Sequence, residues 1–190
     1  GEYQPGWMLL SYGKKVSVSS SLEGYPAENI VDEDARTAWV AQSNRDMEWA
    51  QVDLQRLSSI HAIQVNFDEY GANQKGAVSG VYQSYLIYAS VNGEDWSLVV
   101  DYGTKKTDTP HDYIEFEEPF KARYIKLQNK EYMVSENFSV RDLRIFGKGQ
   151  GSTPRAVNDF TVERDEADPC KARLCWEAVP DAQGYIVRYG

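Results

Sequence analysis

The sequence predicts an all-β protein, an antiparallel β-sandwich followed by a partial second β-sandwich at the C-terminal end. Three observations support this fold class. Short segments of alternating apolar and polar residues recur, turn-forming residues separate them, and no helical pattern of comparable length competes with them. Aromatic residues, which favour strands, make up 13% of the 190 residues. Short strands in this number are typical of two sheets packed face to face.

Eight strands are expected in the first part of the chain. Alternation along each strand places every second side chain on the buried face. A hairpin turn is expected at Asn92-Gly93, because both residues tolerate positive φ. The expected strands are residues 16–20, 49–54, 62–67, 84–91, 96–100, 112–116, 122–129 and 142–146.

A change in composition marks the end of the first sandwich, which we expect to span residues 15–148. Residues 149–155 are rich in Gly, Ser and Pro, which is typical of a linker. Residues 1–14 are expected to connect the sandwich to an upstream domain. Residues 156–190 contain three more alternating segments, but they are too few for an independent sandwich. We therefore expect a truncated second domain that packs against its neighbour.

The composition excludes several classes of partner. The net charge is −9, and an acidic surface repels phosphate backbones and anionic lipid, so nucleic acid is not an expected partner. The sequence has no long apolar run, so no membrane insertion is expected.

Cys170 and Cys175 lie on one expected strand about 16 Å apart, which is too far for a disulfide bond.

The sequence offers no catalytic constellation. His61 lies beside apolar residues and His111 follows a proline, and neither has a serine or cysteine motif nearby. With 29 acidic residues, some pair will always resemble the carboxylates of a glycosidase, so such a pair carries little information. We therefore expect no enzymatic activity from this chain.

Residues 29–39 form an acidic segment in which Asp32 and Asp34 precede Thr37. The segment is not an EF-hand, because Arg36 occupies the fifth position and the sixth is not glycine. The residues alone leave two interpretations. Their oxygens could hold a structural Ca²⁺ ion, or the same side chains could cap turns or a short helix.

Six segments resemble motifs of the discoidin domain, also called the coagulation factor 5/8 type C domain. The first, A-x-N-I-V-D-x-D-x-x-T-x-W, covers residues 27–39 and includes the acidic segment. The others are W-x-x-V-D-L (49–54), I-x-A-I-x-V (60–65), ASVNGEDW (89–96), RYIKL (123–127) and VRDLRIFG (140–147). The resemblance implies a discoidin-like jelly roll. Bacterial members with this fold include family 32 carbohydrate-binding modules attached to secreted glycoside hydrolases.

The resemblance also implies a structural Ca²⁺ site, because the matching loop of that family usually holds calcium. Carried across to this sequence, the candidate ligands are Asn29 (carbonyl), Asp32, Asp34, Thr37, Arg141 (carbonyl) and Asp142. Two residues depart from the family pattern. Glu33 stands where the family favours glycine, and Asp142 stands where it favours glutamate, so the cavity must contract or admit a water.

Sugar recognition needs exposed aromatic rings and polar side chains, which are expected on loops. The candidate loops are residues 42–48, 68–84 and 128–139. The candidate carbohydrate-binding residues are Arg45, Asn44, Tyr70, Asn73, Gln74, Tyr82, Tyr132 and Phe138. The resemblance instead assigns Trp39 and Trp49 to the core, and Trp96, which follows the hairpin turn, is also expected there.

The resemblance implies a non-catalytic module that targets a secreted bacterial enzyme to a plant-type polysaccharide or glycan. Secreted, periplasmic or cell-surface locations fit this role. The arrangement is similar to the C-terminal regions of family 43-like glycosidases, which implies an upstream catalytic domain. The tail resembles strands A to C of a fibronectin type III domain, with Trp176 in its core and Tyr185, Val187 and Tyr189 on one face. The alternative is a spacer or protein-contact module that binds no sugar.

Overall fold

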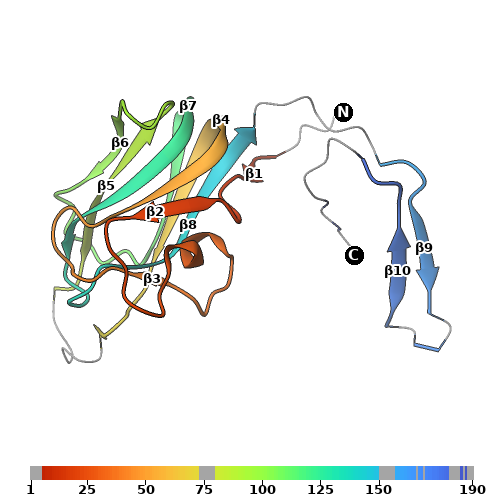
Figure 1. Cartoon of the computed structure of the whole chain (residues 1–190), viewed down its shortest axis with the longest axis horizontal. Coiled ribbons are helices and arrows are strands. Elements are labelled where there is room, and N and C mark those ends of the chain that lie inside the picture. The colour runs from red at the N-terminus through yellow and green to blue at the C-terminus, as the bar shows by residue number, and fades with distance from the viewer. Residues whose placement is uncertain are drawn as a thin grey trace. The chain divides into compact units, whose positions relative to one another are not determined.

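The chain forms two compact units, Gly1–Gln150 and Gly151–Gly190 (Figure 1). The structure is a computed structural model that describes residues 6–72, 80–149, 157–165, 167–168, 170–179, 185 and 187. Among these residues, no helix combines the length and the apolar character needed to cross a membrane.

The first unit consists of antiparallel strands, which confirms the predicted fold class. The strands are β1 (Met8–Leu9), β2 (Lys15–Val18), β3 (Trp39–Val40), β4 (Trp49–Phe67), β5 (Gln83–Ser90), β6 (Ser97–Tyr102), β7 (His111–Tyr132) and β8 (Ser139–Gly149). A short 3-10 helix, η1 (Ala27–Val31), lies between β2 and β3. The order across the sheet is β1-β8-β4-β7-β5-β6, with β2 paired to β4 and β3 paired to β8.

Strands β4 and β7 are longer than expected, because each joins two predicted strands into one. Their pairing shifts register between Asp53 and Ser58, and Gln55 in this interval has a positive φ of 65°. Such irregularities bend a strand. The first half of β4 pairs with β2 and its second half pairs with β8. Because the strand bends between the two halves, the halves lie in the two layers that enclose the core.

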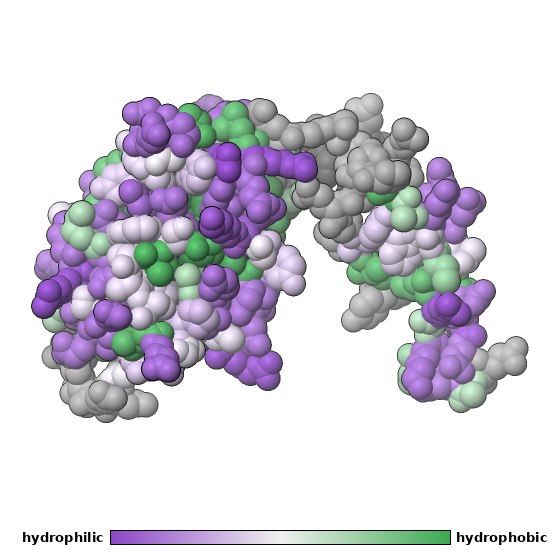
Figure 2. All heavy atoms as spheres, in the orientation of Figure 1, coloured by the Kyte–Doolittle hydropathy of each residue, from purple (hydrophilic) through white to green (hydrophobic). Residues whose placement is uncertain are grey.

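One hydrophobic cluster fills the first unit. Strand alternation points Val52 of β4 and Leu127 of β7 into it, and both are fully buried. The ring of Phe138 packs edge-on against those of Trp39 and Tyr132, with centroids 5.7 Å and 5.3 Å apart. In the view of Figure 2, hydrophilic residues dominate the surface of this unit and apolar ones form small separate groups.

The three tryptophans expected in the core are placed differently. Trp39 is fully buried, as expected. Trp49 and Trp96 are half-buried and lie outside the hydrophobic cluster, so their assignment to the core is wrong. Trp49 alternates with the buried Ala50 on β4 and therefore points to the outer face of the sheet.

The sandwich begins before residue 15, because β1 adds an edge strand to β8. Met8 pairs with Gly147, and Ser11 is 1% exposed. Part of the segment expected as a connection therefore belongs to the first unit. A Cβ at position 147 would lie 2.0 Å from the Ser59 carbonyl oxygen, so only glycine fits where β8 crosses β4.

The second unit contains a hairpin of β9 (Thr161–Arg164) and β10 (Ala172–Cys175). The Trp176 ring lies between those of Tyr185 and Phe160, with centroid distances of 5.1 Å and 6.3 Å. These contacts form an aromatic cluster on the hairpin. Its identity as a fibronectin type III fragment stays a prediction.

Both cysteines of this unit are exposed free thiols. Tyr189 and most of the predicted linker lie outside the described residues. The expected packing of the second unit against the first stays a prediction.

Candidate functional site

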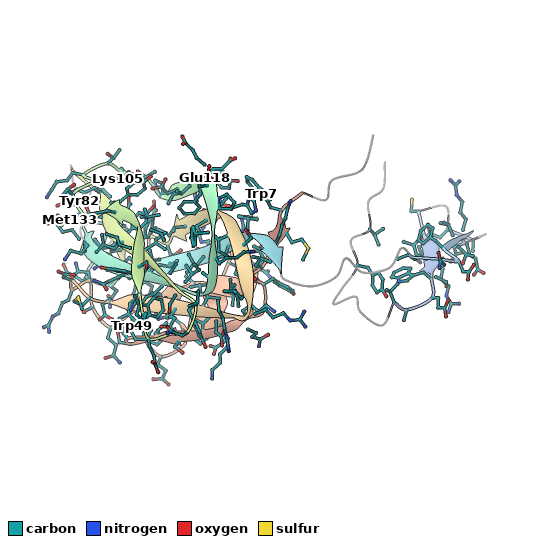
Figure 3. The ribbon with its side chains drawn as sticks, turned by 90° about the horizontal axis from the view of Figure 1, so that it is seen from above. Trp7, Trp49, Tyr82, Lys105, Glu118 and Met133 are labelled. Carbon is teal, nitrogen blue, oxygen red and sulfur yellow. The ribbon has the colours of Figure 1, made fainter. Side chains whose placement is uncertain are left out.

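Five connections meet at one end of the first sandwich, which we call the loop end. They are residues 19–26, 42–48, 68–72 with 80–82, 103–110 and 133–138. Backbone hydrogen bonds join them, including one from the Met133 N–H to the Tyr82 carbonyl, 3.1 Å. Figure 3 shows Tyr82, Lys105 and Met133 at this end, with Trp7 and Glu118 at the opposite one.

The loop before β4 is fixed by amide side chains. Asn44 Nδ2 donates to the carbonyls of Tyr132 and Ser135, at 3.3 Å and 2.8 Å. The fully buried Asn129 donates from its Nδ2 to the carbonyls of Asn44 and Arg45, at 2.8 Å and 2.9 Å. Asn44, a predicted sugar contact, therefore positions the loop. Arg45, another predicted contact, is exposed on it.

An open depression of about 500 Å³ lies between this loop and the serines after β2, with Glu48 among its lining residues. The Glu48 carboxylate accepts hydrogen bonds from Ser19, from Ser20 at 2.8 Å and from Ser43 at 2.6 Å. Burial alone would raise the pKa of Glu48, but the hydroxyl donors, Ser19 foremost, lower it below its ordinary value. This ionised acceptor beside Arg45 can hydrogen-bond the hydroxyls of a sugar. Sequence reasoning missed it, because isolated serines give no signal of a shared carboxylate.

Tyr82, another predicted contact, belongs to a second polar cluster at the loop end. Its hydroxyl donates to Glu131 Oε2 at 2.6 Å, and Lys106 Nζ donates to the same oxygen at 2.9 Å. The Tyr82 hydrogen bond and then that of Lys106 lower the pKa of Glu131. The Lys106 ammonium also lies 4.8 Å from the centroid of the Tyr82 ring. The cluster holds a phenol, an ammonium and a carboxylate in one place.

Tyr70 forms an aromatic pair at the loop end. Its half-buried ring packs edge-on against Tyr25, with centroids 4.9 Å apart and planes at 68°. Tyr25 was not among the predicted residues, because its turn-rich surroundings do not reveal a partner so distant in sequence.

Tyr132 and Phe138 were predicted to contact sugar, but each is 1% exposed. Their rings pack in the core because the segment after β7 folds back, with the Ala41 N–H donating to the Phe138 carbonyl at 2.8 Å. Neither ring can meet a sugar, and the prediction is wrong for both. Asn73 and Gln74 lie outside the described residues.

The acidic loop after η1 is closed by its own hydrogen bonds. Asp32 accepts from the Thr37 hydroxyl and from the Asp34 N–H, both at 2.8 Å. The Asp34 carboxylate turns to Arg36, whose Nε and guanidinium NH₂ both lie 3.0 Å away. This hydrogen bonding lowers the pKa of Asp34 to about 2. These are the turn-capping contacts of the second interpretation, and they engage Asp34.

Strand β8 brings a buried carboxylate to the same region. Asp142 is 3% exposed, and its Oδ2 accepts from Asn66 at 2.8 Å. Its buried Oδ1 has no hydrogen-bond partner among the described residues. Arg144 links the loop to β8, since its Nε donates to Glu33 at 2.9 Å while an NH₂ lies 3.9 Å from Asp142 Oδ1. Glu33 has a positive φ of 61°, which explains why glycine suits this position.

The predicted cation ligands fit in part. The amide of Asn29 donates to the Ala38 carbonyl at 2.8 Å and the Arg141 guanidinium pairs with Asp68, so both side chains are engaged elsewhere, as their prediction as carbonyl ligands allows. Within the described ranges, no group of three acidic, histidine or cysteine side chains is placed to hold a metal. The unpartnered oxygen of Asp142 is the feature that favours a cation here.

Comparison with known proteins finds relatives of the first unit. The family profile of the F5/8 type C domain matches residues 15–143. Lactadherin of Rattus norvegicus is 33% identical over 110 residues, which cover 54% of this chain and 25% of lactadherin. The chain therefore spans about a quarter of the length of this relative.

Two solved structures have a similar fold. Chitosan-binding module 1 of a chitosanase/glucanase from Paenibacillus sp. IK-5 gives a TM-score of 0.62 at 20% identity, covering 74% of this chain and 99% of that chain. The family 32 carbohydrate-binding module of C. perfringens NanJ, solved with galactose, gives 0.58 at 19% identity, covering 74% and 98%. At these identities the similarity establishes the fold alone.

Proposed function

Because this chain belongs to the F5/8 type C domain family, whose profile matches residues 15–143, we propose that its first unit is a non-catalytic carbohydrate-binding module. The observation that carries the proposal is the depression at the loop end. There an ionised Glu48, held by three seryl hydroxyls, lies beside the exposed Arg45. Carboxylate and guanidinium groups are suited to the vicinal hydroxyls of a pyranose.

Different side chains at the loop end can make different contacts with a sugar. Glu48, whose Oε2 already accepts from two serines and whose Oε1 accepts from one, can accept one further hydrogen bond from a sugar hydroxyl, and Arg45 donates to a neighbouring hydroxyl. The half-buried ring of Tyr82 does not line the depression, and in the second polar cluster of the loop end it supplies a further apolar edge whose position Glu131 fixes. So few contacts give weak binding to a single sugar, with a Kd of about 0.1–1 mM, or roughly −4 to −5.5 kcal/mol.

A module that binds weakly becomes useful when it is covalently attached to a catalytic domain. We propose that the parent protein is a secreted bacterial glycoside hydrolase and that the module holds its catalytic domain near a plant-type polysaccharide. Tethering raises the local concentration of the enzyme at the glycan without any new contact. The solved relatives support a choice of probes, because one is described with galactose and another as a chitosan-binding module.

Calorimetry with galactose and with chitooligosaccharides tests the proposal. Arg45→Ala should weaken binding about fivefold to tenfold by removing an exposed hydrogen-bond donor, with an unchanged melting temperature. Lys148→Ala, an exposed change on β8 away from the loop end, is the control and should leave affinity unchanged. A folded chain that binds neither sugar would favour the spacer alternative and refute the proposal.

We also propose a structural Ca²⁺ ion between the acidic loop and β8. Its ligands would be Asp32, Thr37, Asp142 and the carbonyls of Asn29 and Arg141. Asp34 is left out because its charge is paired with the Arg36 guanidinium, whereas Asp32 accepts only from a neutral hydroxyl and a backbone N–H and keeps its charge for a cation. The ion would satisfy Asp142 Oδ1, which has the Arg144 guanidinium 3.9 Å away but no hydrogen bond among the described residues, and it would fasten the loop to the sheet.

Thermal melting with Ca²⁺ and with a chelator tests the cation. Calcium should raise the melting temperature. At a hundredfold excess of Ca²⁺ over Kd, the free energy of unfolding should increase by about 2.7 kcal/mol. Asp142→Asn should abolish the increment, whereas Asp34→Asn, the matched control, should retain it. An identical melt with calcium and with chelator would contradict the site.

A further inference from the structure

The outer face of the sheet formed by β2, β4, β7 and β5 carries aromatic and cationic side chains. Tyr88 of β5 pairs with Lys126 of β7, which pairs with Gln51 of β4. Tyr124 lies on the same face, two residues from Lys126, and Trp96 comes from the hairpin after β5. We call Tyr88, Trp96, Tyr124 and Lys126 the outer ladder. Its members are all half-buried and lie outside the hydrophobic cluster of the core.

The outer ladder alternates rings and charge. The Lys126 ammonium lies 4.0 Å from the centroid of the Trp96 ring and 5.6 Å from that of Tyr88. Trp96 packs edge-on against Tyr124, with centroids 6.5 Å apart and planes at 63°. Leu98, which is 47% exposed, pairs with Tyr88 and extends the apolar surface. The result is an apolar strip with one ammonium in its middle.

Two other cations of the first unit that lie over aromatic rings, one beside the strip and one at the loop end, each have a carboxylate partner. Arg123 lies over Tyr124 but makes two hydrogen bonds to Asp53, at 2.8 Å and 2.9 Å. Lys105 lies 4.5 Å from the Tyr102 ring centroid and pairs with Asp112.

Lys126 is the exception. In the part of the chain that the structure describes, it has ring contacts and no ion pair. Burial lowers its pKa, and no neighbouring carboxylate opposes that effect. The attraction between an anion and a partly desolvated ammonium that has no counter-charge is stronger than the same attraction in bulk water.

We propose that the outer ladder binds an acidic sugar, with its ring against the aromatic strip and its carboxylate on Lys126. The aromatic rings favour the flat apolar face of a pyranose. The unpaired ammonium adds a preference for a uronate over its neutral counterpart. The outer ladder shares no residue with the depression at the loop end, and the inference rests on the proposed function only in sharing the carbohydrate ligand class.

Because the whole chain is acidic, an acidic sugar is attracted only where it directly contacts Lys126. The net charge of −9 repels a polyanion at long range. At 0.15 M salt the Debye length is about 8 Å, so this repulsion is screened while a direct contact with the half-buried Lys126 is not. Binding should therefore be measured at this salt concentration with a short oligomer.

The test compares hexagalacturonate with the same oligomer after its carboxyl groups are reduced to alcohols. Calorimetry should show about fivefold tighter binding of the acidic form, as expected for one partly exposed ion pair. Lys126→Gln should abolish this preference. Lys105→Gln, a matched lysine over a tyrosine ring, should keep it.

The outcomes separate this inference from the proposed function. Arg45→Ala should weaken binding of galactose at the loop end and leave the uronate preference intact. A preference that survives Lys126→Gln would overturn the inference. So would equal binding of the acidic and reduced oligomers, or no binding of hexagalacturonate by the folded chain, even if galactose still binds at the loop end.

Discussion

Trp39 and Trp49 lie in consecutive strands, yet one is in the core and the other faces outward. Trp39 is fully buried, packs edge-on against Phe138 and donates from Nε1 to the Ser20 carbonyl at 2.9 Å. Trp49 alternates with the buried Ala50 and remains half-buried on the outer face. Strand register, and not residue type, therefore decides which rings stabilise this fold and which remain on its surface.

The same contrast holds for two groups of aromatic residues. The inner group, Trp39, Phe67, Tyr132 and Phe138, closes the core beneath the loop end. The outer ladder covers a sheet face and contributes less buried area. Substitutions in the inner group should therefore change stability, whereas substitutions in the outer ladder should mainly change binding.

Truncating an inner ring should have the largest effect. Phe138→Ala removes a ring that touches Trp39, Phe67 and Tyr132, and should lower the free energy of unfolding by about 3–5 kcal/mol. Urea denaturation measures this loss. A decrease below about 1 kcal/mol would show that the inner and outer groups do not differ in packing.

Removing one buried hydroxyl should have a smaller effect. The Tyr132 hydroxyl contacts the Asp68 carbonyl and lies 3.1 Å from Ser139 Oγ. In Tyr132→Phe the Asp68 carbonyl keeps the Ser139 hydroxyl as a donor, at 3.0 Å, but loses that of Tyr132, and the change should destabilise the chain by about 1 kcal/mol. An unchanged denaturation midpoint would contradict this account of how the inner group is anchored.

Truncating a ring of the outer ladder should affect stability less. Trp96→Ala removes a half-buried ring and should lower the free energy of unfolding by about 1 kcal/mol. The same variant should lose most of its binding to hexagalacturonate. A loss of stability as large as that of Phe138→Ala would place Trp96 in the structural group.

The smallest effect concerns a charge pair beside the outer ladder. The Arg123 hydrogen bonds lower the pKa of Asp53, so their contribution is present above about pH 4 and lost as pH falls through the lowered folded-state pKa. For such a surface pair we expect about 0.5 kcal/mol. The difference in stability between the wild type and Asp53→Asn should therefore shrink on acidification, and a difference independent of pH would contradict it.

Alternation and motif spacing predicted most of the fold. The longer strands, the burial of Trp39 and the family follow from local patterns that tertiary contacts did not override, whereas the two-residue strands β1 and β3 were not predicted because they are too short to show alternation. The joining of predicted strands into β4 and β7 did not follow, because bulges carry pairing across residues that read as loops. The outward position of Trp49 was available from its alternation with Gln51 and Asp53, but the family resemblance outweighed that signal.

The site was harder to predict, because its parts meet only through tertiary folding. Glu48 gains its three hydroxyl donors from two loops, and Tyr25 meets Tyr70 across the sandwich end. Tyr132 and Phe138 read as loop aromatics, yet the chain folds them inward. Residue type and loop position therefore suggest which side chains can bind, but they do not determine which are exposed.

The central claim, that the loop end binds a sugar, is tested most directly by an amide chemical-shift titration of the wild-type chain. With about 20 mM galactose, above a Kd of about 1 mM, the account predicts shifts concentrated at Arg45, Glu48 and Tyr82. Shifts absent from these residues at that concentration, in a chain that remains folded, would contradict it.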